Sequence, residues 1–350
     1  MTMLRRMSRG AVALATRAWR GASADLTFLL AKGDTGSCIT SVLVGLAPLT
    51  GRVCIFVHYD RSGTLRAHTR RYLDALIAEG LCIVLVSNSP LSAESRAYLM
   101  ERCASIIFRT NRGYDFGAFR DGILSLEMSS ARLTQLVLAN DSVYGPMVPL
   151  ESLFASMDFS IADIWGVTDS WQTRYHLQSY LMVFGPVALN SPKFAEFWKN
   201  VRNVRSKWAV VRHYEIGMTR TMQMAGLRCA AVFDYQALIR HAEAILDAAA
   251  VADAAEEPRQ PHHAIDTMLR HAAQRATHGA RMRQATNPVI DLWLLLADAG
   301  GPLIKRELLR DDPTYLPDLA AWHRVVKGRA PALYADIMED LKRVMRRSAP

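Results

Sequence analysis

The chain has 350 residues, of which 50% are hydrophobic and 21% charged, and its mean hydropathy is +0.04. These values are typical of a folded globular protein and exclude wholesale disorder, a collagen-like repeat and a polytopic membrane protein. A net charge of +9 and a pI of about 9.5 favour anionic partners such as nucleotides, nucleic acid or acidic lipid.

The N-terminal region is basic. Three arginines among the first nine residues precede a short apolar run, and no acidic residue occurs before Asp25. Because this run is too short for a signal peptide, residues 1–20 could form a basic amphipathic helix on an acidic membrane surface, or a loosely ordered tail. We treat residues 1–50 as a basic N-terminal segment capable of membrane association. No apolar stretch reaches the ~20 residues that a bilayer span requires.

The five cysteines are odd in number and include no Cys-x-x-Cys pair. This pattern excludes a regular disulfide framework and a zinc cluster, and it predicts a reducing, cytoplasmic compartment.

From residue 52 the chain alternates strand-like and helix-like segments. Short apolar, β-branched runs predict buried parallel strands at 53–57, 81–86, 104–108 and 135–139. Apolar residues at helical spacing predict a helix ended by Gly80, and further helices at 92–103 and 116–127. This order predicts an α/β fold with a mostly parallel sheet flanked by helices on both faces.

The second half of the chain is less regular. It contains strand-like runs at 164–168, 179–184 and 229–233 and helix-like runs at 192–202 and 213–225. Residues 241–286 are helical in character and rich in Ala, His and Arg, and the tail ends in a basic helix. We therefore predict a main domain over 51–240 and a helical C-terminal extension over 241–350.

Polar residues follow each of the first four predicted strands. They are His58, Tyr59 and Asp60; Asn88; Asn111, Arg112, Gly113 and Asp115; and Asn140, Asp141 and Ser142. Ligands of open parallel sheets bind beyond the carboxyl ends of the strands, so we expect these side chains to converge there.

Asp141 is the candidate metal ligand, because an acid directly after a buried strand is held rigidly enough to bind Mg²⁺ or Mn²⁺ beside a diphosphate. The alternative interpretation of Asn140-Asp141-Ser142 is an ordinary loop. Arg112 offers a fork suited to phosphate, and Asp115 can cap the following helix; here the alternative is a capped turn with a solvated arginine.

Three further residues are candidates for chemistry. His176 before a strand could bind a metal or a diphosphate, or could simply be packed. Glu215 at the start of a predicted helix could act as a general base, or could be an acid stabilised by the helix dipole. Asp169 is the substitute base.

A series of strings, taken together, resembles the rhamnan synthesis protein F family. They are Val-His-Tyr-Asp (57–60), residues 111–117, Leu-Ala-Asn-Asp-Ser-Val-Tyr-Gly-Pro (138–146), Trp-Gly-Val-Thr-Asp (165–169), His-Leu-Gln-Ser-Tyr (176–180), Phe-Trp-Lys-Asn-Val (197–201), Tyr-Glu-Ile-Gly-Met-Thr (214–219), Asn287-Pro288 and Ile-Lys-Arg-Glu-Leu-Leu-Arg (304–310). The resemblance covers almost everything from about residue 52 to 315.

The resemblance implies a glycosyltransferase of rhamnose-containing cell-surface polysaccharides or lipopolysaccharide O-chains, with a GT-A-like nucleotide-sugar fold. It assigns the metal and diphosphate to Asp141 and the base to Glu215 or Asp169. The implied nucleotide-sugar contacts are His58, Tyr59, Asp60, Asn88, Arg112, Gly113, Asp115, Asn140, His176 and Gln178. A full Asp-x-Asp metal motif is absent, since Ala139 and Val143 lie two residues from Asp141.

The expected partners are a nucleotide-diphosphate sugar and a lipid-linked glycan on the inner face of the cytoplasmic membrane. One rival is a transferase of the same fold with another donor sugar. Others are a basic nucleic-acid-binding module, against which the absence of a known nucleic-acid-binding motif argues, and a non-catalytic scaffold.

Overall fold

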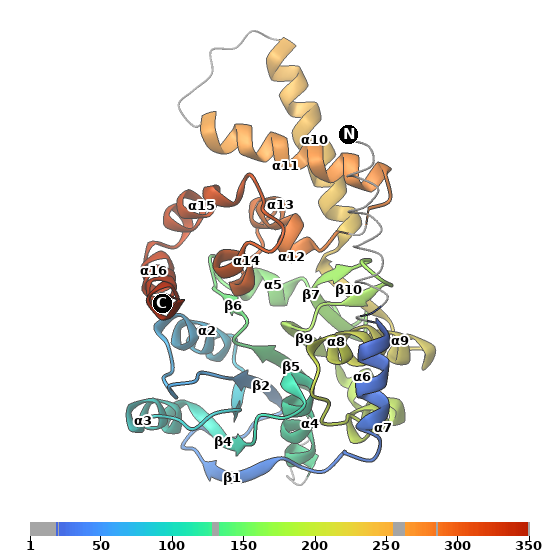
Figure 1. The fold of residues 1–350 in the computed structure, drawn as a ribbon, viewed down its shortest axis with the longest axis vertical. Helices are drawn as coiled ribbons and strands as arrows, with labels where there is room; N and C mark the ends of the chain where they lie inside the picture. The colour runs from blue at the N-terminus through green and yellow to red at the C-terminus, as the bar shows by residue number, and fades with distance from the viewer. Residues whose placement is uncertain (1–18, 20, 128–132, 255–262, 285, 349–350) are drawn as a thin grey trace.

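The computed structural model describes residues 19, 21–127, 133–254, 263–284 and 286–348 (Figure 1). A nine-stranded sheet forms its centre, in the order β1-β4-β3-β2-β5-β9-β7-β10 with β8 paired to β7. The strands are β1 (Ile39–Val44), β2 (Arg52–His58), β3 (Cys82–Ser87), β4 (Cys103–Arg109), β5 (Gln135–Asn140), β7 (Ile164–Ser170), β8 (His176–Leu177), β9 (Leu181–Phe184) and β10 (Cys229–Phe233).

The sheet is mostly parallel, as the sequence predicts. Strands β2, β3, β4, β5, β7 and β10 share one direction, whereas β1, β8 and β9 run against their neighbours. The predicted run 179–184 is therefore the antiparallel strand β9. Strand β1 lies within the segment 1–50 and pairs with β4 at the sheet edge, so this part of the N-terminal segment belongs to the sheet.

Alternation along the buried strands divides the apolar side chains between two cores. Val53, Ile55 and Val57 of β2 face one core, and Cys54 and Phe56 face the other. Both faces are covered, which explains why these strands are apolar throughout instead of alternating with polar residues.

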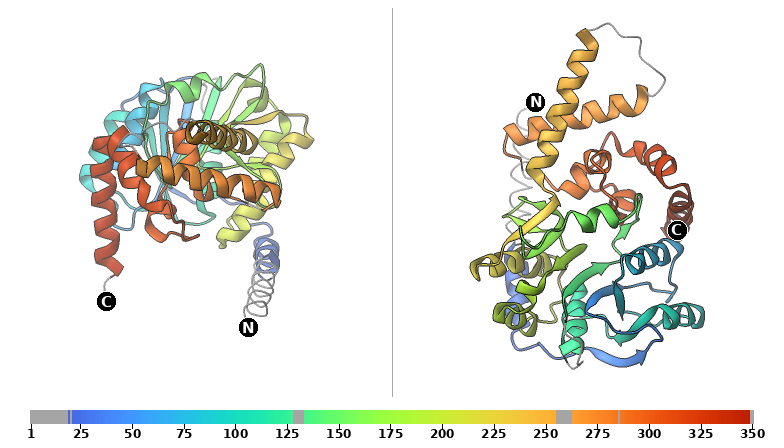
Figure 2. Two further views of the ribbon diagram at one scale, coloured as in Figure 1. Left: turned by 90° about the horizontal axis from the view of Figure 1, so that it is seen from above. Right: turned by 180° about the vertical axis from the view of Figure 1, so that it is seen from behind.

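Helices cover both faces of the sheet (Figures 1 and 2). The core that contains Val53 is closed by α4 (Tyr114–Glu127), α6 (Pro186–Leu189), α7 (Pro192–Lys199), α8 (Lys207–Val210) and α9 (Ile216–Met224). The core that contains Phe56 is closed by α2 (Ala67–Ala78), α3 (Ala93–Arg102), α5 (Glu151–Ala155) and the C-terminal helices.

The C-terminal helices form an arc that returns to α2 (Figure 1). They are α10 (Tyr235–Ala254), α11 (His263–Arg281), α12 (Pro288–Asp291), α13 (Trp293–Asp298), α14 (Arg306–Asp311), α15 (Trp322–Arg329) and α16 (Pro331–Ser348), with a 3₁₀ turn at Leu319–Ala321. Arg71 Nε of α2 donates to Asp336 Oδ2 of α16 at 2.8 Å. Within the described ranges no helix is long and apolar enough to cross a bilayer.

One short strand inserts the C-terminal extension into the main domain. β11 (Ile304–Lys305) pairs antiparallel with β6 (Val143–Tyr144), which directly follows β5. This pairing brings Lys305 and Arg306 to the carboxyl ends of the central strands.

Candidate active site

The site lies where the direction of strand order reverses. From β2 the chain proceeds through β3 to β4 on one side, whereas β5 pairs with β2 on its other side, with Val57 opposite Asn140. In open α/β sheets the crevice beyond the strand ends at such a reversal is the usual ligand site. His58 ends β2 and Asn140 ends β5, so these residues stand on either side of it.

His58 and Asp141 form the centre of the site. Nδ1 of the fully buried His58 lies 2.8 Å from Asp141 Oδ2, and the Tyr59 N–H donates to the same oxygen at 3.1 Å. Burial by itself would raise the pKa of Asp141, but the His58 hydrogen bond and the charges of His58 and Arg306 hold that pKa below its ordinary value. Asp141 is therefore a carboxylate at neutral pH.

Two cations of the C-terminal extension enter the same site. Lys305 Nζ donates to Ser142 Oγ at 2.9 Å and lies 5.3 Å from the centre of the Tyr180 ring. Arg306 Nη1 donates to the Asp141 backbone oxygen and lies 3.7 Å from its carboxylate. Burial lowers the pKa of Lys305, although the nearby carboxylates of Glu215 and Asp115 oppose that shift.

Two acids lie near these cations. Asp115 Oδ2 accepts a hydrogen bond from Asn140 Nδ2 at 3.0 Å, and Glu215 Oε1 accepts one from the Ser179 N–H at 3.0 Å. Burial, helped by the charge of Asp141, raises the pKa of Asp115 to about 6. Asp115, Asp141, Glu215 and Lys305 thus form one electrostatically connected group.

The helix that carries Glu215 begins earlier than predicted. A helical stretch starts at Lys207, passes through a π-helical turn at Val211–Glu215 and continues as α9. Glu215 is therefore inside the stretch, so the explanation that places it in a first turn stabilised by the helix dipole is wrong. Single π turns inside helices are frequent at functional sites, because the wider turn re-aims the side chains that follow.

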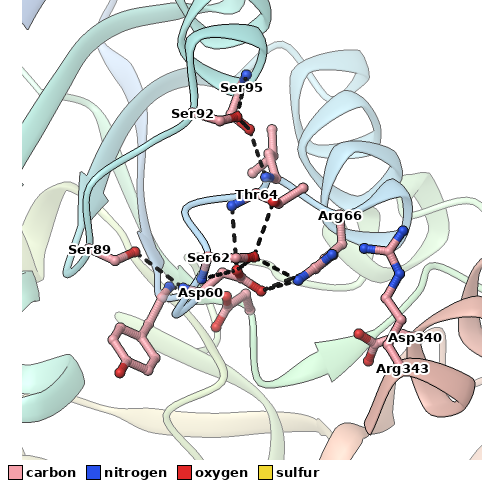
Figure 3. Close-up of polar contacts among 12 residues, drawn as sticks. Asp60, Ser62, Thr64, Arg66, Ser89, Ser92, Ser95, Asp340 and Arg343 are labelled. Atoms are coloured by element: carbon pink, nitrogen blue, oxygen red, sulfur yellow. Dashed lines mark hydrogen bonds and ion pairs between the residues drawn. The ribbon is translucent and has the colours of Figure 1, made fainter. Parts of the chain in front are cut away.

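Asp60 braces its own loop (Figure 3). Its Oδ1 accepts from the N–H of Ser62 at 2.8 Å, and its Oδ2 accepts from Arg66 Nη2 at 2.9 Å. Although burial opposes it, these hydrogen bonds lower the pKa of Asp60 to about 2. Ser89 Oγ accepts from the Asp60 N–H at 3.2 Å and thereby joins this loop to the end of β3.

Asn88 contacts a buried ion-pair cluster. Its Oδ1 accepts from Arg109 Nη1, while Arg109 Nε donates to Asp121 Oδ2 at 2.8 Å. Arg120 Nη2 donates to the other oxygen of Asp121 at 2.8 Å, and all three charged side chains are buried. The cluster ties β4 and α4 together beneath the strand ends.

Arg112 and Gly113 form the turn into α4. Arg112 Nη2 pairs with Asp34 Oδ2, and Gly113 has φ +77° with a Cβ position only 3.1 Å from the Gly117 Cα atom. Glycine is required there by both conformation and space. Helix α4 starts at Tyr114, so Asp115 lies inside the first turn instead of capping it from outside. A hollow of about 350 Å³ beside this turn is lined by Asn111, Arg112, Gly113, Tyr114, Val204 and Arg205.

The remaining predicted residues lie around β7 and β8. Asp169 Oδ1 accepts from the Tyr235 N–H at 2.7 Å and holds the start of α10. His176 Nδ1 lies 2.8 Å from the backbone oxygen of Arg174. Gln178 Oε1 accepts from Thr168 Oγ1 at 2.8 Å, and its amide donates to Asn287 Oδ1 at 3.0 Å. No hydrogen bond or ion pair among the described residues joins these three to Asp141.

The side chains around Asp141 do not fit a divalent cation. The Oδ2 atom of Asp141 already accepts two hydrogen bonds while Arg306 stands 3.7 Å away, and the nearby Asp115 Oδ2 is engaged by Asn140 Nδ2. Over the part of the chain that the structure describes, no three His, Cys, Asp or Glu side chains form a group that could hold a metal. Mg²⁺ and Mn²⁺ prefer several oxygen ligands.

The sequence-based interpretation assigned no role to Lys305 and Arg306. Both belong to the string 304–310, which contributes to the family resemblance and is the one signal in the sequence that could have drawn attention to them. Arg306 is 165 positions from Asp141 along the chain, so the sequence spacing does not indicate that Lys305 and Arg306 lie beside Asp141.

The fold defines an α/β protein with a charged, partly buried candidate site at the strand ends. The model of the family described as "Rhamnan synthesis protein F" matches residues 83–276, and the chain belongs to that family, as the resemblance predicts. It is thereby placed among proteins of polysaccharide synthesis.

Two relatives extend the comparison. An uncharacterized protein, y4gN, of Sinorhizobium fredii is 33% identical over 205 residues, which are 57% of this chain and 52% of that protein. The virulence protein VirA of Vibrio anguillarum is 29% identical over 273 residues, which are 77% of this chain and 82% of that protein. The match thus spans about half the length of y4gN.

The comparison with solved structures gives matches of low similarity. A mannosyltransferase from Pyrobaculum calidifontis, in complex with GDP-Man and Mn²⁺, is 12% identical over 95% of this chain and 98% of that chain, with a TM-score of 0.35. TarS of S. aureus is 12% identical over 85% of this chain and 92% of that chain, with a TM-score of 0.30. TM-scores of this size do not establish a shared fold.

Proposed function

We propose that this protein is a glycosyltransferase that moves a deoxyhexose, rhamnose in the first instance, from a nucleotide-diphosphate sugar to a cell-surface polysaccharide or a lipopolysaccharide O-chain. Membership of the rhamnan synthesis protein F family supports the sugar class. The observation that carries the proposal is that Glu215 and Lys305 meet at neighbouring residues: Glu215 Oε1 accepts from the Ser179 N–H at 3.0 Å, and Lys305 Nζ lies 5.3 Å from the centre of the Tyr180 ring. Transfer of a sugar to a hydroxyl needs a carboxylate that accepts the hydroxyl proton. It also needs a polar site for the departing nucleoside diphosphate.

Glu215 is the proposed general base. Its carboxylate takes the proton of the acceptor hydroxyl, and the acceptor oxygen bonds to the anomeric carbon of the sugar. The bond between that carbon and the β-phosphate oxygen breaks, and the nucleoside diphosphate leaves with the electron pair. Asp169 is less suited, because it holds the start of α10 through the Tyr235 N–H, whereas the Glu215 carboxylate lies close enough to Lys305 to influence its charge.

The nucleotide-sugar contacts remain those implied by the family resemblance. Tyr59 is 43% exposed beside Asp141 and offers a ring on which a base can stack. The other proposed contacts are His58, Asp60, Asn88, Arg112, Gly113, Asp115, Asn140, His176 and Gln178. Because the side chains around Asp141 do not fit a divalent cation, no step is assigned to a metal.

The test is release of nucleoside diphosphate from dTDP-rhamnose, GDP-mannose and GDP-fucose, with and without acceptor glycan. We expect Glu215→Gln to lower kcat by about 100-fold or more, the usual contribution of a general base. Asp169→Asn is the matched acid-to-amide change outside the group formed by Asp115, Asp141, Glu215 and Lys305. It should alter kcat by less than about threefold. Full turnover in both variants would contradict the proposed base. A large loss of kcat in Asp169→Asn with little change in Glu215→Gln would make Asp169 the general base. Turnover of GDP-mannose or GDP-fucose but not dTDP-rhamnose would identify the rival transferase with another donor sugar.

We further propose peripheral contact with the inner face of the cytoplasmic membrane, where a lipid-linked glycan acceptor is found. Exposed apolar side chains on the helix over 21–30 support it, since Leu26, Leu29 and Leu30 are 58%, 63% and 79% exposed. Cosedimentation with vesicles should be strong with phosphatidylglycerol and weak with phosphatidylcholine alone. Salt-sensitive binding of generic DNA with no nucleotide-sugar affinity would instead favour the nucleic-acid-binding rival.

A further inference from the structure

We propose that Lys305 and Arg306 form the diphosphate-binding site of this protein and take the charge-neutralising role expected of a metal at Asp141. The inference rests on the proposed function and deepens it. Its substrate class is the nucleoside diphosphate half of the donor, and the residues come from the C-terminal extension.

Backbone pairing holds both residues in place. Lys305 stands opposite Val143 in the β11–β6 pair, and the Arg306 N–H donates to the Ser142 backbone oxygen at 2.9 Å. These bonds attach them to the loop directly after β5, at the strand-order reversal where ligands of such sheets bind. Two cations on rigid backbone at this edge are suited to hold the two phosphates of a diphosphate.

The hydrogen bonds of the two cations leave room for an anion. Lys305 bonds to the neutral Ser142 hydroxyl, and Arg306 bonds to a backbone oxygen, with the carboxylates of Asp141 and Asp340 each 3.7 Å from its guanidinium. Neither cation makes a close bidentate ion pair, unlike Arg66 with Asp60. Both retain hydrogen-bonding capacity for phosphate oxygens.

Arg306 carries a second indication. Its Nε is buried and has no hydrogen-bond partner, although the guanidinium is a planar fork suited to phosphate. A buried donor without a partner is costly, and a bound anion would supply the missing acceptor.

The alternative is that both cations only fasten the C-terminal extension to the main domain. Arg310, one turn further along α14, does that through Asp340, to which its Nη2 donates at 2.5 Å. Arg310→Gln is therefore the matched control for loosening of the extension. Lys193→Gln, whose side chain on α7 is 54% exposed, is the control for net charge.

The experiment measures binding of dTDP, UDP and GDP by calorimetry in EDTA, and again with Mn²⁺, for the full chain and its variants. Wild type should bind at least one diphosphate in EDTA. Lys305→Gln and Arg306→Gln should each weaken that affinity by about tenfold to 100-fold, as for loss of a charged hydrogen bond. Arg310→Gln and Lys193→Gln should stay within about threefold of wild type on the same scale.

Charge-conserving variants separate binding from folding. Lys305→Arg and Arg306→Lys should keep most of the affinity, and circular dichroism should show that all variants are folded. Inorganic pyrophosphate should compete with dTDP in wild type and lose that ability in Arg306→Gln. Thymidine, which lacks phosphates, should bind every variant equally.

Two results would overturn the inference. One is diphosphate binding that requires Mn²⁺ and is unchanged in Lys305→Gln and Arg306→Gln; the other is an equal loss of affinity in Arg310→Gln. Donor turnover that persists in either case leaves the proposed transferase intact. If no diphosphate binds with or without Mn²⁺ and no donor is turned over, the proposed function fails together with the inference.

Discussion

Asp169 shows how one buried acid links protonation to folding. It is 4% exposed; burial raises its pKa to about 6, although the Tyr235 N–H opposes that shift, and Asp234 adds to it. An unfolded aspartate has a pKa of about 3.9, so the folded chain holds this proton more tightly. The stabilising contribution is full below pH ~4 and is lost as pH rises through ~6.

We therefore expect Asp169→Asn to remove part of the pH dependence of stability. The variant keeps an oxygen acceptor for the Tyr235 N–H and has no charge to desolvate. Relative to wild type, its free energy of unfolding should rise by about 1–3 kcal/mol between pH 4 and pH 7. Urea denaturation at pH 4.5, 5.5 and 7 measures this difference, and parallel curves for the two proteins would contradict it.

Two glycines inside helices differ in whether the surrounding structure leaves space for a Cβ atom. Gly122 in α4 lies against the sheet, and a Cβ there would stand 2.8 Å from Ile55 Cγ2. Gly328 in α15 is exposed, with nothing within 4 Å of a Cβ. The same Gly→Ala change should therefore have opposite signs at the two sites.

We expect Gly122→Ala to lower the free energy of unfolding by about 1–3 kcal/mol, because it overpacks a close-packed helix–sheet contact. Gly328→Ala should raise it by about 0.5–1 kcal/mol, because alanine loses less backbone entropy in a helix. Thermal and urea unfolding of both variants measures the pair. Equal changes in the free energy of unfolding for the two variants would show that the packing of α4 does not require a glycine beside Ile55.

At the scale of the whole molecule, one core joins the sheet to the C-terminal extension. Phe56 of β2, Leu295 of α13 and Leu308 of α14 belong to the same buried cluster. Removing part of that cluster from the sheet or from the extension over 241–350 should therefore destabilise both.

We predict one cooperative unfolding transition. Leu308→Ala should lower the free energy of unfolding of the entire chain by about 2–5 kcal/mol, the usual cost of a buried leucine-to-alanine cavity. Far-ultraviolet circular dichroism and tryptophan fluorescence should report the same midpoint. Separate midpoints, with only one moved by the substitution, would show that the extension unfolds independently.

The sequence by itself determined the local elements and their order. Strands β2 to β5 were predictable because both of their faces are buried, so β-branched apolar runs occur without interruption. The sequence also predicted that polar residues after these strands, including His58 and Asp141, come together, because the carboxyl ends of parallel strands meet at one edge of the sheet. The family followed from the strings and their order.

Only the tertiary structure decided which polar residues share the site. Asp60 pairs with Arg66 in its own loop, Asn88 accepts from Arg109 of the buried cluster, and Arg112 pairs with Asp34, 78 positions away; no periodicity of the sequence indicates these partners. Lys305 reaches Ser142 across 163 positions through a two-residue strand, and such a strand is too short to leave a pattern. Contacts at this separation depend on how the whole chain packs, so no local signal specifies them.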